Sequence, residues 1–331
     1  MVSQAKRKFD MAVVLVAGKI HQKGLELLHG RSDIQVIYVE AVTTDAYRPF
    51  LADADAILIR TQPMTAAEIA LALKLKIVSR HGVGYDAIDI HALNARKIPL
   101  AIVGDVNSRA VAEHTLMLML AAARRTVAHH VGSTTGHWNE RNRFDSTELD
   151  DKIILVIGFG RIGRRVAELA KAFGMRVAAF DPYTTSEQMA ALGVHHVPDM
   201  NTALATADFV TVHVPGGQST LIGAAELACM KPSAILVNAA RGGIIDEQTL
   251  DAALRQRKLR AAALDVLVHE PPGLDHPLLS NPYITISPHN AGLTEECAMR
   301  MGIAAAQNIL DYFDGALDRR LVVNAEAVDL A

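Results

Sequence analysis

Three side chains that could carry out acid–base or anion-binding chemistry follow apolar runs in the second half of the chain. Arg241 follows "AILVNAA", Glu270 comes shortly after "RAAALDV", and His289 follows "YITISP". Histidine can donate or accept a proton near neutral pH, a neighbouring glutamate favours the imidazolium, and arginine offers a planar fork to a carboxylate. Each residue alone is ordinary, since a lone histidine is more often structural. Together they would suit proton transfer to the carbonyl of an anionic substrate.

A glycine loop supplies a second kind of chemistry. "VIGFGRIGRRVAELAKAF" contains Gly158, Gly160 and Gly163 as G-x-G-x-x-G, after an aliphatic run and at the start of a helical pattern. In that context the motif predicts a dinucleotide site. Gly158 permits a tight turn, Gly160 lets the backbone approach a pyrophosphate, and Gly163 lets the helix pack closely on the strand. The alternative is a plain strand–helix turn.

The next apolar run, "MRVAAFDPY", ends at Asp181. A carboxylate at this position can accept hydrogen bonds from the adenosine ribose and would repel a 2′-phosphate. No arginine follows directly to bind such a phosphate. The sequence therefore predicts NAD rather than NADP as the cofactor.

Strand-like and helix-like segments alternate in two series, which predicts an α/β fold with parallel sheets covered by helices. A long helix from about Ala110 to Val127 and a polar stretch separate the two series. The second series starts at Ile153, and an amphipathic helix from about Thr294 to Phe313 ends the pattern. The strand runs of the first series are Val13–Val16, Ile34–Val39, Ala56–Ile59, Lys76–Ser79 and Leu100–Val103.

The carboxyl ends of parallel strands lie along one edge of the sheet, where ligands bind. Arg241, Glu270 and His289 all follow strand runs of the second series, as do Pro215 and Asp265. We therefore expect the three chemical groups to meet beside the glycine loop. That convergence, rather than any single residue, favours a catalytic site.

Composition narrows the functional classes. The 331 residues suggest two domains, and a net charge of -3 gives no basic field for nucleic acid or an anionic membrane. Only two cysteines are present, which favours a reducing, cytoplasmic location. The neighbouring pairs His129-His130 and His195-His196 do not share a helix face, and no other ligands accompany them at suitable spacing, so we expect no metal site.

With these residues in view, the sequence resembles the D-isomer-specific 2-hydroxyacid dehydrogenases. The similar segments run in order from about Arg60 to Ala305 and include "VIGFGRIGRRVA", "NAARGGIIDEQTL", "AALDVLVHEPP", "SPHNAGLTEE", "RHGVGYDAIDI" and "NSRAVAEHTLMLML". The resemblance is to a phosphoglycerate dehydrogenase-like short form without a regulatory domain. It implies two Rossmann-like or flavodoxin-like domains and a homodimer. The NAD-binding domain, residues 105–293, would be inserted into a substrate-binding domain of residues 1–104 plus 294–331.

The resemblance also implies roles for single residues. Arg241 would bind the substrate carboxylate and carbonyl, and His289 would be the acid/base with Glu270 as its partner. Asp265 would lie against the nicotinamide end of the cofactor. The other cofactor-binding residues would be Gly158, Gly160, Arg161, Ile162, Gly163, Asp181, Pro215 and Ala240.

On the substrate side, "SRHGVGYD" places a G-x-G turn just after a strand run. Such a turn leaves N–H groups free for a carboxylate, and the resemblance assigns that role to Val83 and Gly84. The alternative is a simple helix-entry turn. Arg60 resembles a phosphate-contacting arginine of phosphoglycerate dehydrogenases, and the alternative is a surface arginine.

The predicted activity is NAD-dependent interconversion of a D-2-hydroxy acid and its 2-keto acid, with D-3-phosphoglycerate as the favoured substrate. A glyoxylate/hydroxypyruvate-type reductase is the alternative enzyme, and an NAD-sensing corepressor is the non-catalytic one. A formate dehydrogenase is disfavoured because those enzymes resemble the pattern with Gln in place of Glu270. The segment Gly216–Thr220 departs from the family by being shorter, so no contact is assigned to Thr220.

Overall fold

The computed structural model describes residues 11–217 and 219–328. The chain divides into two compact units: unit 1 comprises residues 1–107 and 295–331, and unit 2 comprises residues 108–294. In sequence, unit 2 is thus inserted into unit 1. The observed divisions lie within a few residues of those expected at 104/105 and 293/294.

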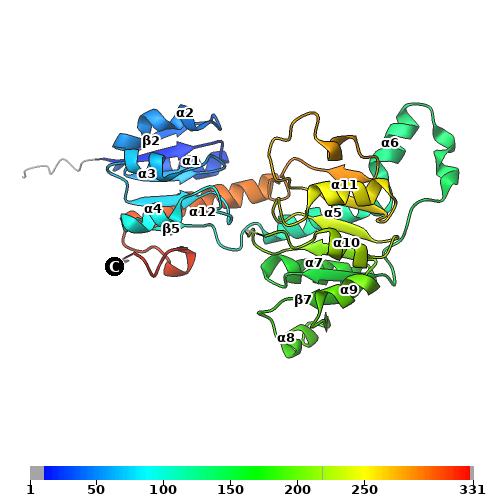
Figure 1. Cartoon of the computed structure of the whole chain (residues 1–331). Coiled ribbons are helices and arrows are strands. Elements are labelled where there is room, and N and C mark those ends of the chain that lie inside the picture. Colours follow the sequence, from blue (N-terminus) through cyan, green and yellow to red (C-terminus); the bar gives the residue numbers. More distant parts are fainter. Residues whose placement is uncertain (1–10, 218, 329–331) are drawn as a thin grey trace, which may run out of the picture. The chain divides into compact units, whose positions relative to one another are not determined.

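Unit 1 contains a five-stranded, all-parallel sheet in the order β2-β1-β3-β4-β5 (Figure 1). Its strands are β1 (Ala12–Ala17), β2 (Ile34–Val39), β3 (Ala56–Ile59), β4 (Ile77–Arg80) and β5 (Leu100–Ala101). Its helices are α1 (Gln22–His29), α2 (Thr44–Tyr47), α3 (Ala66–Leu71), α4 (Ile90–Ala95) and α12 (Glu295–Phe313), with short 3-10 turns η1 (Arg48–Asp53) and η4 (Arg319–Leu321).

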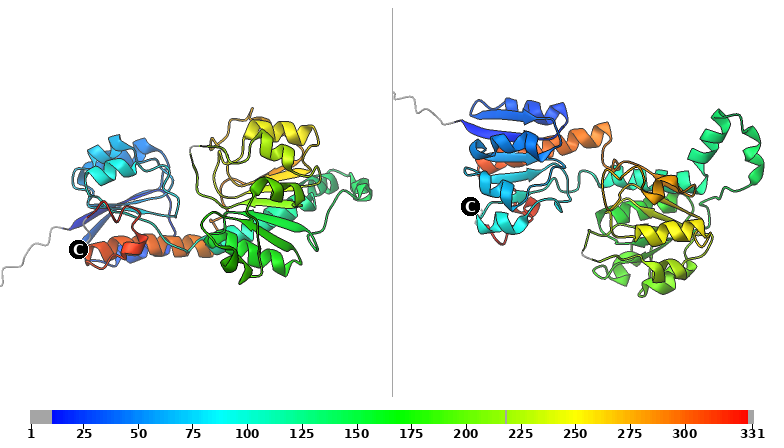
Figure 2. Two further views of the ribbon diagram at one scale, coloured as in Figure 1. Left: turned by 60° about the horizontal axis from the view of Figure 1, so that its bottom comes forward. Right: turned by 45° about the horizontal axis from the view of Figure 1, so that its top comes forward.

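Helices cover both faces of the unit 1 sheet. On one face α12 packs against α1 and against the sheet, and the contact between the two helices is close: a Cβ on Gly24 would lie 2.5 Å from the carbonyl oxygen of Gly302. Figure 2 shows α12 running along the sheet of this unit. On the other face Tyr47, Leu51 and Ile69 join the apolar side chains of the strands in a buried core.

Unit 2 contains a seven-stranded, all-parallel sheet in the order β12-β11-β10-β9-β6-β7-β8. Its strands are β6 (Ile153–Ile157), β7 (Arg176–Phe180), β8 (His195–His196), β9 (Phe209–Val212), β10 (Ile235–Asn238), β11 (Ala261–Leu264) and β12 (Ile284–Ile286). The strand order reverses direction between β6 and β9, which is where a doubly wound sheet binds its ligand. The predicted α/β class is confirmed.

The helices of unit 2 explain why its strands are continuously apolar. Alternate residues of one strand enter different cores: Ile154 and Val156 pack on one face, whereas Leu155 and Ile157 pack on the other. A strand buried on both faces has no polar side. The helices are α5 (Ser108–Ala123), α6 (Thr126–Thr134), α7 (Arg161–Ala172), α8 (Ser186–Ala190), α9 (Met200–Thr206), α10 (Ala224–Cys229) and α11 (Glu247–Arg255), with 3-10 turns η2 (Trp138–Arg143) and η3 (Pro277–Ser280).

Two local features differ from the expectation. The helix predicted from Ala110 to Val127 is two helices, because Arg125 adopts a left-handed conformation with φ 51° and interrupts the helical hydrogen bonds. An ion pair between Arg125 and Asp145 accompanies this break. The two-residue strand β8 was not predicted, since a segment that short has no periodicity to recognise.

No helix among the described residues is both long and apolar enough to cross a bilayer. Over the same residues, no group of three or more His, Cys, Asp or Glu side chains is arranged to hold a metal ion.

The glycine loop allows a stability prediction. A Cβ on Gly163 would lie 2.1 Å from the carbonyl oxygen of Gly158, whereas a Cβ on Gly160 would meet nothing within 4 Å. We expect Gly163→Ala to lower the free energy of unfolding by about 1–3 kcal/mol, because α7 must move away from β6. Gly160→Ala should change it by less than about 0.5 kcal/mol.

Urea denaturation of the full chain measures both variants under the same conditions. Equal stability of the two variants would contradict the close packing of α7 on the loop.

Candidate active site

Three neighbouring strands deliver the predicted chemical residues to one edge of the unit 2 sheet. Arg241 lies in the loop after β10, Asp265 directly follows β11, and His289 follows β12. The side chain of Asn238, at the end of β10, holds the first loop: its Nδ2 donates to the Arg241 carbonyl at 2.8 Å, and its Oδ1 accepts from the Ala240 N–H at 2.9 Å. The backbone beneath Arg241 is therefore fixed from inside the sheet.

The loops after β10 and β11 touch at Gly242. A Cβ on this residue would lie 2.1 Å from the carbonyl oxygen of Leu267, so only glycine fits. The N–H of the same Leu267 donates to Oε1 of Glu270 at 2.8 Å. The segment that carries Arg241 thus packs on the segment that orients Glu270.

Glu270 in turn holds His289. The Glu270 Oε2 lies 2.6 Å from the His289 Nδ1, and the two side chains are 35% and 51% exposed. Since an ionised carboxylate only accepts, Nδ1 carries the hydrogen in this pair. Nε2 remains as the ring nitrogen that can exchange a proton with a ligand. The predicted partnership of these two residues is present in the structure as a hydrogen bond.

Asp265 is almost completely buried, with 1% of its surface exposed. Its Oδ1 accepts from the Ser287 hydroxyl at 2.5 Å and from the Asn290 N–H at 3.0 Å, and its Oδ2 accepts from the Ala291 N–H at 2.9 Å. Burial, the largest influence, raises the pKa of this carboxyl, but hydrogen bonds from His114, Ser287 and the backbone outweigh it and hold the pKa below its usual range. The group is a carboxylate at neutral pH.

The glycine loop has the features that a bound dinucleotide requires. Gly158 has φ 90°, and a Cβ there would lie 2.6 Å from the carbonyl oxygen of His213. Gly160 is open to solvent and forms the N-cap of α7 without a side-chain cap, so the loop leaves room for a pyrophosphate. At the start of the helix Arg161 is exposed, while Ile162 packs against the core.

Asp181 lies against this loop. Its Oδ2 accepts from the N–H of Phe159 at 2.6 Å, and its Oδ1 accepts from the N–H of Tyr183 at 2.7 Å. A negative charge therefore borders the loop, as the NAD prediction requires. Pro215 and Ala240 follow β9 and β10 at the same edge of the sheet.

The predicted substrate residues lie in unit 1. Arg60 follows β3, and its guanidinium donates to the Lys19 carbonyl at 3.2 Å. Val83 and Gly84 belong to the turn after the neighbouring strand β4. The guanidinium of Arg80 braces that turn by donating to the carbonyl of Gly84 at 2.8 Å and of His81 at 2.6 Å.

Sequence reasoning missed three residues of these networks. Arg80 and Ser287 fall within motifs or strand runs that give neither residue a role of its own. His114 lies in "AVAEHTLMLML", where a single polar residue on an apolar helix gives no sign of its partner. Its Nε2 is 2.9 Å from the Ser287 Oγ. A possible signal was that His114 interrupts a long apolar run.

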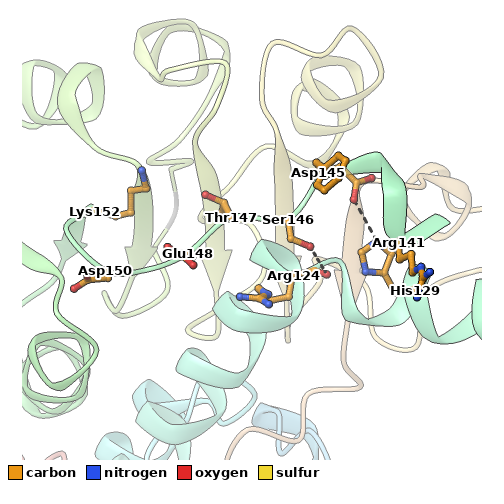
Figure 3. Close-up of a pocket in the computed structure, with 10 residues that line it drawn as sticks. Arg124, His129, Arg141, Asp145, Ser146, Thr147, Glu148, Asp150 and Lys152 are labelled. Carbon is orange, nitrogen blue, oxygen red and sulfur yellow. Dashed lines mark hydrogen bonds and ion pairs between the residues drawn. The ribbon is translucent and has the colours of Figure 1, made fainter. Parts of the chain in front are cut away.

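A pocket of about 520 Å³ lies elsewhere in unit 2, near the break between α5 and α6. Figure 3 shows Arg124, His129, Arg141 and Asp145 around it, with His129 paired to Asp145. None of the predicted site residues lines this pocket. It is therefore separate from the edge of the sheet that carries Arg241, Glu270 and His289.

Comparison with known proteins gives a consistent picture. The chain is 39% identical over 315 residues to a D-3-phosphoglycerate dehydrogenase of Methanocaldococcus jannaschii, covering 94% of this chain and 59% of the relative. Thus the chain spans about three fifths of the length of this relative.

Solved structures agree at the level of the fold. A crystal structure of a Thermus thermophilus protein is 29% identical with a TM-score of 0.85, covering 94% of this chain and 99% of that chain. An NADPH-dependent glyoxylate/hydroxypyruvate reductase of Sinorhizobium meliloti is 25% identical with a TM-score of 0.83, covering 96% of this chain and 99% of that chain.

The family model for the D-isomer specific 2-hydroxyacid dehydrogenase, NAD binding domain, matches residues 116–291. This range covers more than half of the chain and nearly all of unit 2, including the glycine loop and the His289–Glu270 pair. The chain belongs to the D-isomer specific 2-hydroxyacid dehydrogenase family.

Proposed function

We propose that the chain is an NAD-dependent D-2-hydroxyacid dehydrogenase that interconverts a D-2-hydroxy acid and its 2-keto acid. The observation that carries this proposal is the hydrogen bond between His289 and Glu270 at the carboxyl edge of the sheet that also bears the glycine loop. NADH, when bound, supplies the hydride for reduction of the keto acid. Residues 158–163 would hold its pyrophosphate, in the space left open at Gly160.

In this proposal His289 moves the proton. During reduction its Nε2–H donates to the carbonyl oxygen as negative charge develops there, and during oxidation Nε2 accepts the hydroxyl proton. Glu270 stabilises the imidazolium through Nδ1 and keeps Nε2 directed away from itself. Arg241 would bind the substrate carboxylate and stabilise charge on the carbonyl oxygen.

The favoured substrate is D-3-phosphoglycerate. Relatives at 39% and 38% identity carry the name D-3-phosphoglycerate dehydrogenase, and Arg60 of unit 1 would supply a cation for the phosphate. Val83 and Gly84 would offer backbone N–H groups to the carboxylate. The alternative is a glyoxylate/hydroxypyruvate-type reductase, which is favoured by solved structures of that description at 25% identity.

For the cofactor we propose NAD in preference to NADP. The Asp181 carboxylate is placed at the glycine loop by its bond to Phe159 N–H. There it can accept from the ribose hydroxyls of NAD, and it would repel the 2′-phosphate of NADP.

Steady-state assays of the purified chain test these assignments. The panel comprises phosphohydroxypyruvate, hydroxypyruvate, glyoxylate and a bulky 2-keto acid, each with NADH and with NADPH. We expect the highest kcat/KM with phosphohydroxypyruvate and NADH. Highest activity with glyoxylate or hydroxypyruvate would select the reductase instead. NADH binding without turnover of any keto acid would select the NAD-sensing corepressor.

We also propose a cytoplasmic location, because both cysteines are free and such thiols persist in a reducing compartment. Cell fractionation with antibody detection tests this, and recovery outside the cytoplasmic fraction would contradict it.

We further propose a homodimer formed through unit 2. The segment of α6 and η2 extends from the layered part of this unit (Figure 1) and exposes large apolar side chains. Val127 and Val131 are more than half exposed, Trp138 is 65% exposed and Phe144 is 90% exposed. Apolar surface of this extent on one segment is typical of a protein contact.

If this segment forms the dimer, Phe144→Ser combined with Trp138→Ser should shift the chain from dimer to monomer. Both side chains are already exposed, so the fold of the monomer should persist. Sedimentation equilibrium gives the mass directly, and Tyr183→Ser, at another residue that is 93% exposed, is the control. An unchanged dimer in the double variant would place the interface elsewhere.

His289→Ala should bind NADH with a Kd close to that of the unaltered protein but should turn over about 10²- to 10⁴-fold more slowly, since the proton donor is lost. Fluorescence titration gives the Kd and NADH oxidation gives the rate. Turnover near that of the unaltered protein would exclude His289 as the acid/base.

Glu270→Gln should move the falling limb of the pH–rate profile for keto acid reduction to lower pH. The carboxylate 2.6 Å from Nδ1 favours the protonated ring, and reduction requires that form. Replacing it by a neutral amide weakens this preference, so the acid form is lost earlier as pH rises. A profile that superimposes on the original would show that the pair does not control the proton.

A further inference from the structure

A network behind the His289–Glu270 pair has no role in the mechanism described above. It consists of His114 on α5, Ser287 after β12 and the buried carboxylate of Asp265. The Nε2 of His114 lies 2.9 Å from the Ser287 Oγ and 3.3 Å from the Asp265 Oδ1. Ser287 Oγ is 2.5 Å from the same Oδ1. All three residues belong to unit 2.

The direction of each hydrogen bond follows from the donors that are present. Ionised Asp265 can only accept, so the single hydrogen of the Ser287 hydroxyl points to its Oδ1. The hydroxyl must then accept from His114, which requires a hydrogen on Nε2. His114 is thus the outermost donor of a chain that ends on the carboxylate.

The carboxylate is also the anchor of the turn that presents His289. It accepts from the backbone N–H groups of Asn290 and Ala291, and the Asp265 carbonyl accepts from the His289 N–H at 2.8 Å. His289 itself adopts φ 50°, a left-handed conformation that a residue with a Cβ takes only when its surroundings impose it. These bonds are the local interactions that hold the turn in that conformation.

We propose that His114 is a positioning residue: by donating from Nε2 to Ser287 and Asp265 it fixes the carboxylate that holds residues 289–291, and so sets the direction of the His289 ring. This inference rests on the proposed function, because the direction of the ring matters only if His289 transfers a proton to a bound substrate. A displacement of about 1 Å at a reacting group is enough to cost about 10²-fold in rate.

A merely structural histidine would contribute packing, which distinguishes two variants. His114→Leu keeps much of the volume but removes the donor, whereas His114→Gln keeps an N–H donor at similar reach. We expect His114→Leu to lower kcat by about 10²-fold with the NADH Kd nearly unchanged, and His114→Gln to recover most of the rate. Ser287→Ala, which removes the intermediate hydroxyl, should behave like His114→Leu.

Amide hydrogen exchange on the protein without substrate gives a readout that does not depend on turnover. The N–H groups of Asn290 and Ala291 should exchange faster in His114→Leu and Ser287→Ala, and close to the original rate in His114→Gln. Glu113→Gln is the control, since Glu113 is an exposed neighbour on α5 outside the network, and neither kcat nor exchange should change.

Unchanged kcat in His114→Leu, or equal losses of kcat in His114→Leu and His114→Gln, overturns the proposal. Unchanged exchange at Asn290 and Ala291 in both His114→Leu and Ser287→Ala also overturns it. Failure of the proposed function gives a different result: the unaltered protein reduces none of the keto acids with NADH, while the exchange of Asn290 and Ala291 still responds to His114→Leu.

Discussion

The carboxylate of Asp265 is the group to which the candidate active site is tied. Removing a charge from water costs several kcal/mol, and that cost is offset only when hydrogen bonds satisfy the oxygen atoms. Here the satisfying donors come from the end of β12, from the turn after it and from α5. Because the carboxylate cannot remain buried without them, the side chain that needs these donors also determines where the turn lies.

The loops are also tied to one another by direct contacts. Gly242 lets the loop after β10 approach the Leu267 carbonyl, and the N–H of Leu267 orients Glu270. Glu270 then orients His289 from the other side of the ring. The imidazole is thus restrained twice, once through its backbone and once through Nδ1, which leaves Nε2 as the atom for chemistry. Such restraint keeps an exposed side chain in one orientation before a ligand binds.

The two large features of unit 2 are separate in the structure. The sheet edge carries the charged and titratable groups, whereas the pocket of about 520 Å³ lies beside the α6–η2 segment. The left-handed Arg125 separates α6 from α5, and Asp145 pairs with both Arg125 and His129 at this point. A helix that continued through Arg125 would have kept its apolar residues along the axis of α5. The break instead leads the chain into a segment whose aromatic side chains are exposed.

The sequence by itself determined the class of fold and the residues at the site. Apolar runs that are buried on both faces identify parallel strands, and the residue after each run must lie at the shared edge, so Arg241, Asp265 and His289 could be named from the sequence. The spacing of Gly158, Gly160 and Gly163 was sufficient for the dinucleotide loop, because each glycine answers a local steric demand.

Only the tertiary structure decided how these residues are held. Hydrogen bonds between His114 and Ser287, or between Asp181 and Phe159, join positions that no local pattern connects. The left-handed backbone of Arg125 and His289 is likewise imposed by contacts from other segments, since neither residue type favours that conformation. Local sequence therefore specifies which groups reach the edge of the sheet, and long-range hydrogen bonding specifies the direction in which they point.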